Sequence, residues 1–217
     1  MAITMPADPV ASALSLPNGA RFYRCALQVN PYEYVVREKK PTRFRDEHSY
    51  NIALVEACKQ HDVEVIAVTD HYKIRSGAGL CQAARAAGIH VFPGFEAKTK
   101  DGVHVLCLFD RERQPDVIER FIGACGIQED SPGAASRTHD ALELLAEAPR
   151  WQAICIAAHV DLPRGGLLGT LSGQPRINTW KSEHLAACSL PGPISSAPEN
   201  LRPILENNRR SSIKLPM

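Results

Sequence analysis

Four side chains of metal-ligating type end or interrupt apolar runs of the sequence: His71, Glu96, His104 and His159. Neutral imidazoles and a carboxylate form a ligand set that suits zinc, manganese or iron, and a carboxylate can bridge two ions. One histidine in a strand is more often a packed core residue than a ligand. Four such groups in similar contexts are harder to explain by packing alone, and together they indicate a metal site.

The apolar runs that end at or contain these side chains are typical of buried strands. They span residues 63–68, 90–95, 103–109 and 152–158. Two more strands are expected at 22–29 and 185–190, and helices are expected at 49–60, 79–87, 115–124, 138–147 and 198–207. Alternating strands and helices predict an α/β fold with a mostly parallel sheet. In (β/α) barrels, catalytic groups gather at the carboxyl ends of the strands.

The connections between these elements carry further expectations. Residues 31–47 read as a polar, basic loop, and Ser49 is a plausible N-cap for the helix that follows. A turn at 100–102 predicts a hairpin between the strands on either side. We expect a loose segment at 1–20, one domain at 21–207 and a tail at 208–217.

Composition limits the classes of function. The chain has 217 residues and a formal net charge of +1, so its net charge does not indicate nucleic-acid binding, which stays possible. A run of five cations between Arg37 and Arg45 is either a solvated loop or a phosphate contact. The seven cysteines form no CxxC pair and read as reduced, buried thiols. No apolar run reaches the ~20 residues that span a bilayer, and no signal peptide is recognised, so we expect a cytoplasmic protein.

The order of these motifs resembles the PHP (polymerase and histidinol phosphatase) family. The resembling motifs are VIAVTDH, GFE, a hairpin strand with VH, and a strand ending in AAH, and the likeness covers roughly residues 22–160. The resemblance implies a distorted (β/α)₇ barrel that holds up to three metal ions. It also implies that His71 is a ligand of one ion, that Glu96 is the bridging carboxylate, and that His104 and His159 complete the shell of a second ion. Similar domains lie at the amino terminus of larger ATPase-associated bacterial proteins.

The sequence departs from the family pattern at both ends. Where the family has His-x-His on its first strand, this chain has Gln28 and Asn30, whose amide oxygens are weaker metal ligands. Asp46 or His48 could supply a third-site ligand, although capping of a helix explains Asp46 equally well. No Asp-x-His motif follows Asn208. We therefore expect a barrel that is incomplete at its carboxyl-terminal end, with an exposed sheet edge that a protein partner could complete.

Three functions are compatible with this pattern. The first is a metal-dependent phosphoesterase that acts on a phosphorylated substrate of unknown class, with one to three zinc, manganese or iron ions. Its catalytic residues would be His71, Glu96 and His159, and Arg164 would hold the substrate phosphate. Asp70 joins Gln28, Asn30 and Asp46 as a weaker candidate ligand. The second is a catalytically impaired PHP-like interaction module with a partial metal site, and the third is an α/β domain without a site.

Overall fold

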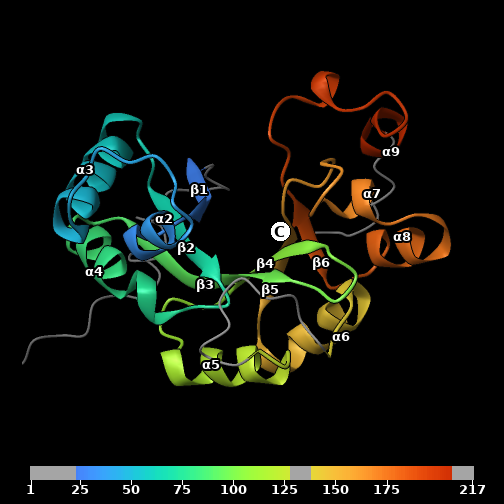
Figure 1. Ribbon diagram of the computed structural model, residues 1–217, viewed down its shortest axis with the longest axis horizontal. Coiled ribbons are helices and arrows are strands. Elements are labelled where there is room, and N and C mark those ends of the chain that lie inside the picture. The colour runs from blue at the N-terminus through green and yellow to red at the C-terminus, as the bar shows by residue number, and fades with distance from the viewer. Residues whose placement is uncertain (1–22, 128–137, 207–217) are drawn as a thin grey trace, which may run out of the picture.

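Six strands form one sheet in chain order, and the sheet curls into a half-barrel (Figure 1). The computed structural model describes residues 23–127 and 138–206. The strands are β1 (Cys25–Val29), β2 (Val65–His71), β3 (His90–Lys98), β4 (His104–Leu108), β5 (Ile154–Ala157) and β6 (Leu185–Cys188). β4 pairs antiparallel with β3 and with β5, whereas the other neighbours pair in parallel. This confirms the predicted α/β fold with an incomplete barrel.

The reversed direction of β4 decides where its first residue lies. Because β3 and β5 run in one direction and β4 in the other, the amino end of β4 reaches the edge at which β3 and β5 have their carboxyl ends. His104 is the first residue of β4. It therefore lies at the same edge as the end of β3 and the residues just after β5. The predicted hairpin between β3 and β4 is confirmed by this antiparallel pairing.

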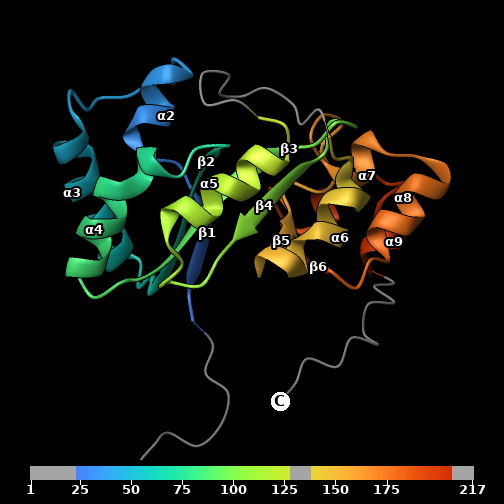
Figure 2. The same ribbon diagram turned by 90° about the horizontal axis from the view of Figure 1, so that it is seen from below.

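Helices pack outside the curled sheet, as Figures 1 and 2 show. They are α2 (Tyr32–Arg37), α3 (Glu47–Gln60), α4 (Ala78–Ala86), α5 (Pro115–Ala124), α6 (Ala141–Trp151), α7 (Leu167–Thr170), α8 (Gly173–Trp180) and α9 (Arg202–Glu206), with 3₁₀ turns at Arg75–Gly77 and Ile194–Ser196. Side chains alternate between the two faces of a strand. On β2, Ile66 and Val68 therefore pack in the cluster that includes residues of α3 and α4, while Ala67 joins an inner cluster with Leu106.

Several local predictions are wrong for identifiable reasons. The expected loop at 31–47 contains α2, a helix with no buried residue and hence no apolar periodicity to reveal it. Asp46, not Ser49, is the N-cap of α3, because its side chain accepts a hydrogen bond from the backbone N–H of Ser49. α6 begins later than expected because Asp140 forms a capping box, and α7 and α8 lie where only loops were expected.

Other expectations are met only in part. All seven cysteines are free thiols, but only four are buried, and Cys25 is exposed. β3 continues two residues beyond Glu96. The predicted segments 1–20 and 208–217 lie outside the described residues, as do residues 128–137. Within those residues, no helix is both long and apolar enough to cross a membrane.

Candidate metal centre

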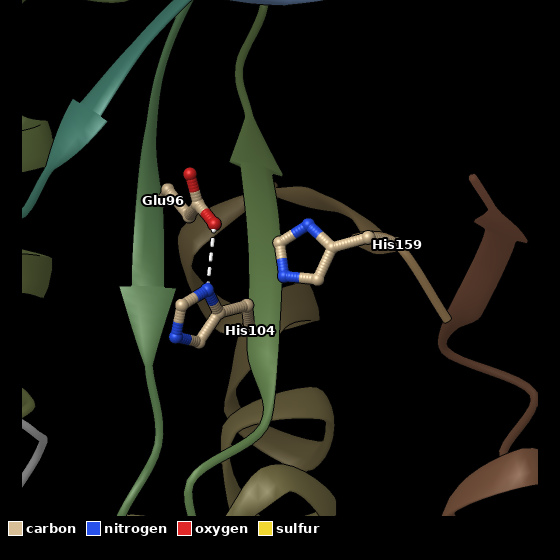
Figure 3. Close-up of side chains that lie close together, drawn as sticks. All are labelled: Glu96, His104 and His159. Carbon is tan, nitrogen blue, oxygen red and sulfur yellow. Dashed lines mark hydrogen bonds and ion pairs between the residues drawn. The ribbon is translucent and has the colours of Figure 1, made fainter. Parts of the chain in front are cut away.

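Glu96, His104 and His159 meet at the carboxyl edge of the half-barrel (Figure 3). Glu96 lies near the end of β3, His104 begins β4, and His159 follows β5 by two residues. One potential ligand atom from each residue lies within 4.8 Å of the others. A buried carboxylate and two imidazoles at this spacing fit a zinc, manganese or iron ion by the chemistry of their donor atoms.

Glu96 is the charged centre of this group. It is only 3% exposed, and its two oxygens have separate partners. Oε1 lies 2.9 Å from Nδ1 of His104, and Oε2 accepts a hydrogen bond of 2.8 Å from Nε2 of Gln28. Burial raises the pKa of Glu96, but the hydrogen bond from His104, the charges of both neighbouring histidines and the hydrogen bond from Gln28 together hold it below the ordinary value. Glu96 is therefore an ionised carboxylate, the form that binds a metal ion.

His159 has an unusual backbone. Its φ of +33° places it in the left-handed region, which residues with a side chain seldom adopt. Its N–H donates to Oγ of Ser189 at 2.9 Å, and its carbonyl accepts from the N–H of Leu162 at 2.9 Å. Backbone strain of this kind persists where the surroundings fix it, and it concentrates at functional sites. Burial lowers the pKa of His159, so its imidazole is neutral and able to bind a metal.

Gly165 supports both imidazoles and was not predicted from the sequence. A Cβ atom at this position would lie 2.8 Å from Nε2 of His159 and 3.2 Å from Nδ1 of His104. The carbonyl of Gly165 also accepts a hydrogen bond of 2.7 Å from the N–H of His104. The adjacent glycines 165 and 166, soon after His159, are the sequence signal that could have revealed this close approach.

His71 lies beside this group but not within it. Its Nε2 is 3.9 Å from Oε2 of Glu96, and its Nδ1 is buried without a hydrogen-bond partner among the described residues. Its ring is 5.5 Å from the ring of His104, which is 5.1 Å from that of His159. Burial lowers the pKa of His71, so this imidazole is also neutral.

Asp70 is committed to structural contacts. Its carboxylate accepts hydrogen bonds from both Nη atoms of Arg37, from Oγ of Ser76 at 2.8 Å and from the N–H of His71 at 2.6 Å. Four donors leave this carboxylate little capacity for a metal ion. Arg37, the first cation of the basic run, is thus part of an ion pair rather than an open phosphate site.

None of the remaining candidates belongs to the three-residue group. The carbonyl of Asn30 accepts from the hydroxyl of Tyr50 at 2.9 Å, while its Oδ1 is buried without a partner among the described residues. Asp46 caps α3, and His48 is exposed at the start of that helix. Arg164 is exposed and precedes Gly165, which places it next to the backbone that supports the two imidazoles.

Comparisons with known proteins identify the fold. No protein-family model matches the chain, and no curated protein matches it. Among solved structures, the chain is similar to a protein from Bifidobacterium adolescentis assigned as a metal-dependent phosphoesterase, with a TM-score of 0.58, 12% identity, and coverage of 87% of this chain and 84% of that one. It is also similar to a lesion-specific endonuclease, endonuclease Q of Pyrococcus furiosus, with a TM-score of 0.52, 14% identity, and coverage of 74% and 40%.

A two-domain protein from Bacteroides vulgatus, described as containing a predicted PHP-like metal-dependent phosphoesterase, matches with a TM-score of 0.47, 12% identity, and coverage of 76% of this chain and 43% of that one. The predicted link to ATPase-associated proteins finds no support among these structures. The chain shares its fold with the protein assigned as a metal-dependent phosphoesterase and with endonuclease Q.

Proposed function

We propose that the chain is a metal-dependent phosphoesterase that holds one divalent ion through Glu96, His104 and His159. The observation that carries this proposal is the convergence of an ionised, buried carboxylate and two imidazoles at the carboxyl edge of a PHP-like half-barrel. A bound ion would lower the pKa of water and stabilise charge on a phosphoryl group. Zinc, manganese and iron all suit this donor set.

Gln28 favours one ion over a pair bridged by Glu96. A carboxylate only accepts hydrogen bonds, so Gln28 must present its NH₂ group to Oε2 of Glu96. That neutral donor occupies the side of Glu96 that faces β1, and it leaves Oε1 with the two imidazoles. In this proposal, Glu96 binds a single ion. The family resemblance alone would imply that Glu96 bridges two ions.

Two further residues have proposed roles in the reaction. His71 is neutral and lies beside Glu96, so it can accept a proton from the attacking water. Arg164 is exposed next to Gly165, and its guanidinium can pair with the oxygens of a substrate phosphate.

Metal content and turnover of the purified chain test this function. We expect about one ion per chain by elemental mass spectrometry, and hydrolysis of p-nitrophenyl phosphate, its diester or a duplex oligonucleotide. Glu96→Gln and His159→Ala should each weaken metal binding by about 100-fold or more and abolish turnover, while circular dichroism stays unchanged. His61→Ala is the matched control, because His61 is exposed at the end of α3. Protein that binds none of the three metals and hydrolyses none of the substrates would contradict the proposal.

A catalytically impaired interaction module is the second candidate, and the hydrogen bond from Gln28 to Glu96 favours it. A site with an amide in place of an imidazole ligand can retain one ion without turning over substrate. Among the described residues, β1 and β6 each pair on one side only, so a protein partner could add a strand there. Stoichiometric metal without turnover of any ester would support this candidate over the first.

A further inference from the structure

The short helix α2 lies at the candidate site without contributing to a core. None of its six residues is buried. An ion pair links α2 to the sheet: Arg37 of this helix pairs with Asp70, which is 1% exposed and immediately precedes His71. A second ion pair of 3.0 Å joins Glu33 of this helix to Lys73. A buried carboxylate requires a charged partner, so Arg37 holds α2 at this edge of the sheet.

This attachment places the ring of Tyr34 against that of His71. The ring centroid of Tyr34 lies 5.6 Å from that of His71, and the guanidinium carbon of Arg37 lies over the Tyr34 ring, 5.7 Å from its centroid. The row of rings that begins at Tyr34 continues through His71 and His104 to His159. Burial and, next, the negative charge of Glu96 raise the pKa of Tyr34. Tyr34 therefore borders the same space as the candidate metal group.

The hydroxyl of Tyr34 differs from those of the neighbouring tyrosines. Tyr32, Tyr50 and Tyr72 donate their hydroxyls to backbone carbonyls, at 3.4, 2.9 and 2.7 Å. The Tyr34 hydroxyl has no hydrogen-bond partner among the described residues, and it is not one of the buried unpaired atoms, so solvent reaches it. A half-buried ring with an accessible, uncommitted donor is suited to bind a ligand that enters the site.

We propose that Tyr34 is a substrate-binding residue whose hydroxyl donates a hydrogen bond to a phosphate oxygen of the ester. The ion pair between Arg37 and Asp70 positions the ring of Tyr34. This assignment rests on the proposed phosphoesterase function, because the phosphate is held at the candidate metal group. It adds a contact from α2 that neither the three proposed metal ligands, nor His71, nor Arg164 supplies.

Binding of inorganic phosphate to the metal-loaded, full-length chain tests the role of Tyr34. Tyr34→Phe removes only the hydroxyl, and Tyr32→Phe makes the same change on the same helix at a residue whose hydroxyl already has a backbone partner. By calorimetry, Tyr34→Phe should weaken phosphate binding about tenfold, the loss expected for one hydrogen bond to a charged acceptor. Tyr32→Phe should change it less than twofold. Metal content should be equal in all three proteins.

Steady-state kinetics give a second measurement. With p-nitrophenyl phosphate, Tyr34→Phe should raise KM and leave kcat nearly unchanged, because the hydrogen bond is made to the bound substrate as well as to the transition state. If Tyr34→Phe binds phosphate as tightly as the unaltered chain, the role of Tyr34 is overturned while the phosphoesterase proposal stands. If the unaltered chain neither binds phosphate nor hydrolyses an ester with any of the three metals, both proposals are overturned.

Discussion

Gly165 lies against both imidazoles of the candidate metal group, with its backbone in the left-handed region at a φ of +84°. Two separate constraints therefore act on this residue. Any L-residue would be strained by the positive φ, and any Cβ atom would be forced into His159 and His104. Gly88 has nearly the same φ, +83°, but nothing within 4 Å of the position of a Cβ. The chain thus contains its own control for the first constraint.

The prediction at the residue scale compares Gly165→Ala with Gly88→Ala. Gly88→Ala should lower the free energy of unfolding by about 1 kcal/mol, the cost of a left-handed alanine, without affecting metal affinity. Gly165→Ala should lower it further and weaken zinc binding at least tenfold, because the new methyl group displaces the ligand rings. Urea unfolding and zinc titration measure the two effects. Equal zinc affinities in the two variants would show that the rings do not need their present positions.

At the scale of elements, α2 has no buried residue, and its Arg37 forms an ion pair with the buried Asp70. Arg37→Met would leave the carboxylate of Asp70 buried with only Ser76 and a backbone N–H as donors. Removing one partner of a buried pair typically costs about 3 kcal/mol or more. We expect this loss in the free energy of unfolding, together with faster hydrogen exchange at the amides of α2.

Arg75→Met is the matched control for that prediction. Arg75 also pairs with two carboxylates, Glu119 and Asp116, but its side chain is 64% exposed. Exposed ion pairs contribute little to stability, so Arg75→Met should alter the free energy of unfolding little and leave exchange in α2 unchanged. If both variants lose the same free energy of unfolding, the burial of Asp70 does not make its ion pair more stabilising than the exposed ion pairs of Arg75, and the prediction is contradicted.

The elements that sequence reasoning found are those with apolar runs. β2 and β5 were predictable because continuous apolar residues are needed where a strand is covered on both faces. α2 carries no such signal, since none of its residues is buried. α7 has four residues and α8 has one buried residue, Thr179, so neither shows a clear apolar stripe.

The residues of the candidate site also divide into those with a local sequence pattern and those without one. Glu96, His104 and His159 could be selected because each side chain contrasts with the apolar run around it. The role of Gly165 depends on a turn that returns to β4, and the contact of Gln28 with Glu96 joins residues 68 positions apart. Contacts that arise only from the curled arrangement of the sheet have no local pattern in the sequence.

At the scale of the whole molecule, the candidate site joins three segments that are otherwise connected through the sheet. The inner face of the half-barrel carries a small apolar cluster, and Ile154 at the start of β5, whose side chain points to this face, is 54% exposed. Less apolar area is therefore buried on this side than beneath the helices. A metal ion bound to the ends of β3 and β5 and to the start of β4 would add a link between strands where the core contributes little.

Metal should consequently stabilise the fold as a whole. A ligand at 100 times its Kd adds about 2.7 kcal/mol to the free energy of unfolding. For a chain of this size, that corresponds to a rise in Tm of about 5–10 °C. Thermal unfolding should show this rise when zinc is added to metal-free protein, and its reversal when the metal is removed by a chelator. Glu96→Gln should show no rise, because the buried charge that holds the ion is absent. An equal rise in that variant would mean that the stabilising ion binds elsewhere, with the cysteine thiols as the alternative ligands to examine.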